Sequence, residues 1–183
     1  MDGKFWFTQC LALIGALLYF LSYQCRDNRK LYLVQFFSYV AYTAHFIILG
    51  AMTGGLSYIL NLARSLFLAS KWEFARSKKM CLLLCMMQIV VLATTWVGWI
   101  SLLSVCANIA STIGGYTHNA AKIRIASICF NSPLWIVYDF IVGSWAGMVD
   151  EAVSIAWDTK VLGEISRSFK VTYYSGNFTV NMV

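Results

Sequence analysis

Polar side chains stand inside several long apolar runs of this sequence, and they are its candidates for chemistry. Ionisable and amide groups are costly in hydrocarbon unless they are paired or wetted, so each marks a place where a partner is required. Four of these side chains are ionisable and three are amides. They are His45, Asp139, Asp150 and Glu151, and Asn61, Asn108 and Asn131.

Spacing from two glycine turns places these groups at two depths. His45 is five residues before Gly50 and Asp139 four before Gly143, while the two adjacent acids follow Gly143 by seven and eight residues. At about 1.5 Å per residue, all four ionisable groups are expected within roughly 6–12 Å of these turns, with the asparagines nearer mid-bilayer. A small polar solute or cation fits between the layers, because amides donate and accept hydrogen bonds while a carboxylate carries charge. The predicted substrate-binding residues are Asn61, Asn108, Asn131, His45, Asp139 and Glu151.

Each candidate also has a structural interpretation. His45 and Asp139 are expected to face each other at similar depth, either as a structural lock or as part of a solute site. Asp150 and Glu151 are adjacent, about 100° apart on a helix, so we do not expect them to share one face. Arg64 is interpreted as an anchor near the inner end of its helix rather than as a solute clamp. Asparagines inside a membrane more often link helices than bind a ligand.

No signature of a soluble-type enzyme is present. The sequence lacks a zinc-protease motif, a nucleophile elbow, a phosphate-binding loop and a dinucleotide fingerprint. Its six cysteines are scattered through apolar runs without partnered histidines, which favours packing over metal binding. We therefore expect a protein that is not an enzyme and has no cofactor and no metal.

Composition indicates a membrane protein. Hydrophobic residues make up 60% of the 183 residues and charged residues 12%, with a mean hydropathy of +0.67; soluble domains are about half apolar and a quarter charged. The net charge of +6 could suggest a nucleic-acid partner. The basic residues instead lie in short clusters between apolar runs, as cytoplasmic loops require, so nucleic acid is excluded.

Seven apolar runs predict an all-α polytopic membrane protein with seven transmembrane helices. The runs form a single membrane domain over residues 1–165, followed by a polar, poorly ordered cytoplasmic tail over 166–183. The expected spans are Phe5–Tyr23, Leu31–Leu49, Leu56–Ser70, 80–95, Ile100–Gly114, Ile123–Val142 and Trp145–Leu162.

Charge placement predicts the orientation of these helices. With seven crossings, 13 of the 14 Lys and Arg residues fall on one side, and only Lys4 falls on the other. Positive residues stay in the cytoplasm. We therefore expect the N-terminus outside and the C-terminus inside.

A constant offset of 93 residues indicates a diverged tandem duplication. It arranges the helices as a 3+1+3 parallel repeat, with three-helix units over residues 5–70 and 99–162, a linker over 71–79 and a connecting helix over 80–95. The matches are Trp6 with Trp99, Tyr23 with Tyr116, Arg29 with Lys122, Phe37 with Phe130, Tyr42 with Trp135, Gly50 with Gly143 and Gly54 with Gly147.

Four motifs in order resemble the YgjV family of bacterial inner-membrane proteins across roughly Trp6–Ile155. They are RDNRKLYLVQ, AHFIILGAMTGG, TTWVGWISLL and SPLWIVYDFIVGSWAGMVDE. The resemblance implies a multi-pass protein of the bacterial inner membrane. The helix layout is also similar to that of SWEET sugar transporters, although those use several proline hinges and this chain has only Pro133. After Ile155, the residues AWDTKVLGEISRSFKV depart from the pattern expected for the family's last helix.

Three functions remain open at this stage. The favoured one is a SWEET-like transporter or channel for a small polar solute. The first alternative is a membrane-embedded metal-dependent enzyme using Asp139, Asp150 and Glu151, and the second is a non-catalytic membrane partner. The expected partners are the lipid bilayer and the unidentified solute, and a homo-oligomer is compatible with all three functions.

Overall fold

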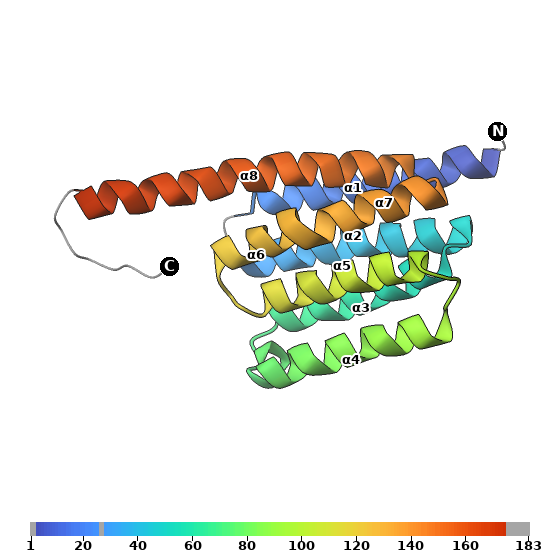
Figure 1. Cartoon of the computed structure of the whole chain (residues 1–183), viewed down its shortest axis with the longest axis horizontal. Coiled ribbons are helices and arrows are strands. Elements are labelled where there is room, and N and C mark those ends of the chain that lie inside the picture. The colour runs from blue at the N-terminus through green and yellow to red at the C-terminus, as the bar shows by residue number, and fades with distance from the viewer. Residues whose placement is uncertain (1–2, 26–27, 175–183) are drawn as a thin grey trace.

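The computed structural model describes residues 3–25 and 28–174. Within these residues the chain is helical and contains no strand, as predicted (Figure 1). The helices α6, η2 and α7 follow one another without a break, so the described part of the chain has seven long helical segments besides the short helix η1. In chain order these are α1 (Gly3–Tyr23), α2 (Asn28–Leu49), α3 (Met52–Ala69), η1 (Phe74–Arg76), α4 (Lys78–Thr94), α5 (Ile100–Gly115), α6 (Ala120–Ala126), η2 (Ser127–Asn131), α7 (Ser132–Val142) and α8 (Trp145–Tyr174).

The helix bounds follow the predicted spans closely except at the last helix. The polar tail was expected to begin at Ser166, but α8 continues to Tyr174. Lys160 and Glu164 are four residues apart, and Glu164 and Arg167 are three apart, spacings at which opposite charges support a solvated helix. Residues 166–174 are therefore helical, and the rest of the predicted tail lies outside the described residues.

Length and hydropathy support an all-α membrane protein. Three helical stretches are long and apolar enough to cross a membrane: Gly3–Ser22, Arg29–Leu49 and Ala120–Val142. The helix α5 is equally apolar but has 16 residues, and α4 has 17. These lengths lie at the lower limit of about 17 residues for a spanning helix.

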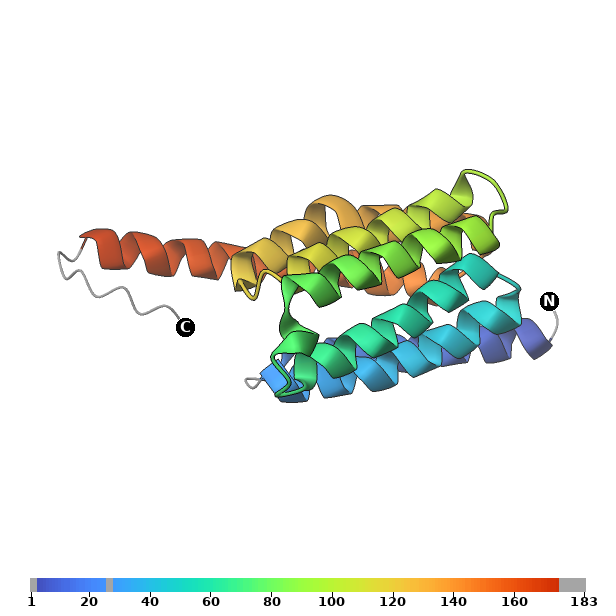
Figure 2. The same cartoon turned by 90° about the horizontal axis from the view of Figure 1, so that it is seen from below.

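The two ends of the bundle differ in character. The described chain enters α1 at one end, and α8 leaves at the other (Figures 1 and 2). The start of α2, the short helix η1 and the start of α6, which carry most of the cationic clusters, lie at the end where α8 leaves. The glycine turns between α2 and α3 and between α7 and α8 lie at the opposite end.

Those two glycine turns share one backbone conformation. Gly50 has φ +79° and Gly143 φ +78°, a left-handed conformation that glycine adopts at little cost. In each turn, the next residue donates its N–H to the carbonyl five residues back, as in a Schellman motif. These bonds are Ala51 N to Phe46 O at 2.9 Å and Ser144 N to Asp139 O at 2.8 Å. The predicted offset of 93 relates the two bonds, while superposition of the whole three-helix units stays a prediction.

Aromatic side chains fill the centre where α2, α3 and α7 meet. Phe46 is fully buried and stacks on Tyr58 and Trp135, with ring centroids 5.4 and 5.5 Å apart. Tyr42 stacks on Tyr58 at 5.2 Å. Tyr and Trp keep a polar atom at one edge of the ring, so a core built from them can also border a polar cavity.

The segment α6–η2–α7 changes its helical winding before Pro133. Proline has no N–H to donate and disturbs the preceding turn, and residues 127–131 form a π-helix in which Ser132 N bonds to Ser127 O. Such wide turns often occur at functional sites. Here the wide turn ends at Asn131, one of the predicted amides.

Candidate functional site

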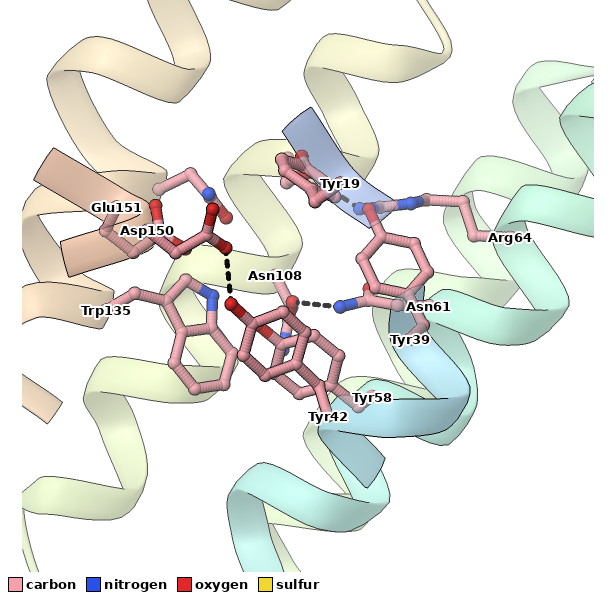
Figure 3. Close-up of a pocket in the computed structure, with 12 residues that line it drawn as sticks. Tyr19, Tyr39, Tyr42, Tyr58, Asn61, Arg64, Asn108, Trp135, Asp150 and Glu151 are labelled. Carbon is pink, nitrogen blue, oxygen red and sulfur yellow. Dashed lines mark hydrogen bonds between the residues drawn. The ribbon is translucent and has the colours of Figure 1, made fainter. Parts of the chain in front are cut away.

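A cavity lies inside the bundle, bordered by α1, α2, α3, α5, η2, α7 and α8 (Figure 3). It encloses about 290 Å³, part of it open to the surroundings, and about 20 Å³ can hold the centre of a water molecule. That space suits one or two waters. The cavity is lined by Tyr19, Tyr39, Tyr42, Tyr58, Asn61, Arg64, Asn108, Ser111, Asn131, Trp135, Asp150 and Glu151.

Two of the predicted asparagines bond to each other in this cavity. Asn61 Nδ2 donates to Asn108 Oδ1 at 2.7 Å, and both side chains are buried. The other two amide atoms, Asn61 Oδ1 and Asn108 Nδ2, are buried without a partner in the described protein. A buried polar atom without a partner costs about 1–3 kcal/mol, and the acceptor and the donor in question belong to two side chains that border the cavity.

Two carboxyl groups, from two neighbouring faces of α8, border the same cavity. Asp150 and Glu151 are each 8% exposed, and Tyr42 Oη donates to Asp150 Oδ2 at 2.5 Å. Glu151 Oε2 is buried without a hydrogen bond of ordinary geometry in the described protein, and the hydroxyl of Ser132 interacts with the same carboxyl group. Adjacent positions of α8 reach one cavity because it is broad enough to border two neighbouring faces of the helix.

Arg64 also borders the cavity, which the interpretation of this residue as an inner-side anchor did not include. Its guanidinium is buried and donates to Ser111 Oγ at 2.9 Å, Thr112 Oγ1 at 3.3 Å and Tyr39 Oη at 3.1 Å. These oxygens are neutral, and no carboxylate of the described residues lies within 4.0 Å of it. Figure 3 shows Arg64 on one side of the cavity and the two acids on the opposite side. The cavity therefore has a cationic side chain on one side and two acidic side chains on the opposite side.

His45 and Asp139 do not border this cavity but belong to a separate cluster at the glycine-turn end. His45 Nδ1 lies 2.7 Å from Thr8 O, and His45 Nε2 lies 2.8 Å from Ser144 Oγ. The same hydroxyl interacts with the Asp139 carboxyl group. The predicted pairing is thus indirect, with Ser144 as the bridge, and the predicted solute set divides into four cavity residues and two cluster residues.

Hydrogen-bond chemistry constrains the protons of this cluster. The Thr8 carbonyl can only accept, so His45 Nδ1 carries a proton. Ser144 has one hydroxyl hydrogen. If Ser144 donates to Nε2, its bond to Asp139 requires a protonated carboxyl; if it donates to Asp139, its bond to Nε2 requires an imidazolium. In both arrangements His45 and Asp139 share one proton through Ser144.

The cluster also fixes the turn between α7 and α8 to α1. Gln9 Nε2 donates to Gly143 O at 2.9 Å, and Ala146 N donates to Gln9 Oε1 at 3.2 Å. Together with Thr8 and His45, these bonds join α1, α2, α7 and α8 near one end of the bundle. This supports the structural-lock interpretation of the pair.

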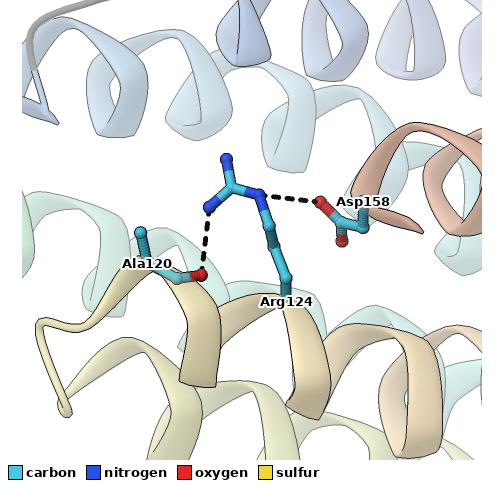
Figure 4. Close-up of polar contacts among 3 residues, drawn as sticks. All are labelled: Ala120, Arg124 and Asp158. Atoms are coloured by element: carbon cyan, nitrogen blue, oxygen red, sulfur yellow. Dashed lines mark hydrogen bonds and ion pairs between the residues drawn. The ribbon is translucent and has the colours of Figure 1, made fainter. Parts of the chain in front are cut away.

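A buried ion pair lies at the cationic end. Arg124 Nε is 3.8 Å from Asp158 Oδ1, and Arg124 Nη1 donates to Ala120 O at 3.0 Å (Figure 4). The Asp158 side chain is 3% exposed and that of Arg124 is 21% exposed. The pair connects α6 to α8 and was absent from the sequence-based candidates.

Sequence reasoning missed the aromatic walls of the cavity and the position of Arg64 at it. The aromatic residues stand in apolar runs like any core residue, so their type alone carries no signal. The offset of 93 did carry a signal for these residues, because it pairs Tyr42 with Trp135 and also Tyr58 with Glu151. All four of these residues border the cavity.

The geometry bears on the metal-dependent alternative. Asp139 lies in the Ser144 cluster, whereas Asp150 and Glu151 lie in the cavity. Across residues 3–25 and 28–174, no three His, Cys, Asp or Glu side chains are grouped so that they could hold a metal ion. The three acids do not form one ligand set.

Comparison with known proteins gives one match. The Imp-YgjV family model, described as bacterial inner membrane protein, matches residues 6–160. No curated protein and no solved structure matches. The match covers most of the apolar bundle and includes both groups of polar residues. The chain belongs to the Imp-YgjV family of bacterial inner membrane proteins.

Proposed function

We propose that the protein moves a small polar solute across the bacterial inner membrane and that the central cavity is its solute site. The observation that carries this proposal is the set of buried atoms without partners there: Asn61 Oδ1, Asn108 Nδ2 and Glu151 Oε2. Polar groups that only joined helices would satisfy one another. These atoms instead leave a donor and two acceptors beside the cavity.

In this proposal the structure corresponds to a closed state of the carrier. Space for only one or two waters is too small for most metabolites, so a solute would enter after the helices move apart. The wide turn before Pro133 lies at the cavity wall and is the natural place for such a movement. The helix α8 also borders this cavity, and the ion pair of Arg124 and Asp158 connects α8 to α6.

We further propose an outside N-terminus and a cytoplasmic C-terminus, since this places the cationic clusters in the cytoplasm. The His45 cluster then lies in the outer half of the membrane, and the ion pair lies near the inner surface. We propose no enzymatic activity, because the acids of the metal-dependent alternative lie in two separate sites.

Flux in liposomes tests the proposal. Purified protein is reconstituted into liposomes, and each batch of liposomes is loaded with one unlabelled solute from a panel of sugars, amino acids, nucleosides and cations. Uptake of the same solute in labelled form from outside is then measured. We expect exchange for one chemical class, and a loss of at least tenfold in Asn108→Ala. Exposed Lys122→Gln is the matched control and should exchange normally. Absence of exchange for every solute, in protein that remains folded, would refute the proposal.

A further inference from the structure

We infer that the solute of the cavity is a small zwitterion, held with its carboxylate toward Arg64 and its ammonium group toward Asp150 and Glu151. This inference rests on the proposed function and specifies its substrate class. It follows from the placement of unlike charges on opposite sides of one cavity (Figure 3).

The cationic side is suited to a carboxylate. Arg64 is 6% exposed, and its partners Tyr39, Ser111 and Thr112 offer only neutral oxygens. A buried charge without a counter-charge is costly. The planar guanidinium matches a carboxylate with two parallel hydrogen bonds, so a ligand carboxylate would supply the missing charge.

The anionic side is suited to an ammonium group. Asp150 already accepts from Tyr42, whereas Glu151 Oε2 has no hydrogen bond of ordinary geometry in the described protein. The rings of Tyr58 and Trp135, with centroids 4.9 Å apart, border the same cavity. Aromatic faces attract cations, and a carboxylate beside them adds the opposite charge. An ammonium group there would pair with Glu151.

The amide pair completes the selection. Asn61 Oδ1 and Asn108 Nδ2 can accept and donate, and Figure 3 shows their side chains between the two charged sides. A sugar would satisfy these amides but leave both charged sides unpaired. A simple amine would leave Arg64 without a counter-charge, and a simple carboxylate would leave Asp150 and Glu151 without one. Sites with buried polar groups reject ligands that leave those groups unpaired.

Binding to the purified full-length protein, measured by isothermal titration, tests the assignment. The probes are glycine, L-alanine and 4-aminobutyrate, which carry both charges at different separations, with glycinamide, acetate and glucose as analogues that lack one or both. We expect at least one zwitterion to bind at least tenfold more tightly than every analogue. Equal affinity for an analogue would overturn the inference.

Two variants assign the ends. Arg64→Gln should bind the preferred zwitterion at least tenfold more weakly while its affinity for glycinamide stays within twofold, because only the carboxylate end changes. Glu151→Gln should weaken both ligands, since both carry the ammonium group. Lys122→Gln should behave like the unchanged protein. If Arg64→Gln is folded and its affinity for the zwitterion is unaltered, the assignment is overturned. If Arg64→Gln does not fold, Ser111→Ala replaces it, because this variant keeps the guanidinium. Ser111→Ala must then lower the affinity for the zwitterion without lowering the affinity for glycinamide.

The outcomes separate this inference from the proposed function. If liposomes exchange glucose but no zwitterion, the zwitterion inference is refuted and the proposed carrier function is still supported. No exchange of any solute would overturn both. Exchange of the same zwitterion that binds, lost in Arg64→Gln, would support both.

Discussion

Gly54 in the first turn of α3 provides a sharp test of the packing between the two halves of the bundle. Its N–H donates to Tyr138 Oη at 3.0 Å, which satisfies a helix-start donor that has no partner within the helix. A Cβ atom at this position would lie 2.7 Å from Tyr138 Oη and 3.0 Å from Tyr138 Cε1. Ordinary contact begins near 3.4 Å, so Tyr138 must move away in Gly54→Ala.

The expected cost follows from three effects. Displacing Tyr138, which is 2% exposed and packed in the aromatic centre, is overpacking of about 1–3 kcal/mol. Losing the hydrogen bond to Gly54 N adds about 1 kcal/mol. Replacing glycine by alanine within a helix returns up to about 1 kcal/mol. We therefore expect Gly54→Ala to lower the free energy of unfolding by about 1–3 kcal/mol.

Gly55 supplies the matched control. A Cβ there would lie 2.9 Å from Ile47 Cγ1, so Ile47 must shift, but this side chain is 42% exposed and its shift displaces no ring of the aromatic centre and no hydrogen bond between helices. Gly55→Ala gains the same helix propensity at less steric cost, so its stability should change by less than about 1 kcal/mol. Unfolding of both variants in mixed detergent micelles, followed by circular dichroism, gives the comparison. Gly54→Ala as stable as Gly55→Ala would refute the packing of α3 on α7.

Three further predictions concern the polar contacts and the topology. Ser144→Ala removes the bridge between His45 and Asp139 and should cost about 1–3 kcal/mol in the same unfolding assay, because two buried groups lose a partner; an unchanged stability would contradict the bridge. Arg124→Gln should destabilise more than the double variant with Asp158→Asn, since the single change leaves a buried carboxylate unpaired; a single variant no less stable than the double would contradict the pair. Reporter fusions at residues 3 and 170 should report opposite sides, with residue 170 cytoplasmic, and both ends on one side would contradict seven crossings.

The helices could be predicted because their limits are written in local sequence. Apolar runs define the bodies of the helices, and glycine or charge interrupts them at the ends. The helix that starts at Ile100 begins at the predicted residue, and α7 ends at Val142 as predicted. The end of α8 could not be found this way, since a solvated helix needs only compatible charges and no apolar face.

The cavity could be predicted only in part, because it depends on which helices are neighbours. Polarity singled out Asn61, Asn108, Asn131 and Glu151, and these residues do border it. Depth estimates grouped His45 with Glu151. The cluster and the cavity are bordered by the same helices α1, α2, α7 and α8, and they are separated along the bundle axis, because Tyr42 and Trp135 lie about one helical turn farther from the glycine turns than His45 and Asp139. Arg64 was interpreted as an anchor near the inner end of its helix, since its place in the cavity depends on neighbours such as Tyr39 of α2, 25 residues away.

The predicted duplication offers a physical reason for a two-ended cavity. The offset of 93 relates Arg64 to Trp157, Asp150 to Ser57 and Glu151 to Tyr58, so each charged wall residue corresponds to an uncharged residue in the other unit. Two identical units would place like charges on both sides of the cavity and would suit a ligand with two similar ends. On the predicted duplication, divergence would have left the cation in the first unit and the anions in the second. A site of this kind distinguishes the two ends of its ligand, which is the property that recognition of a zwitterion requires.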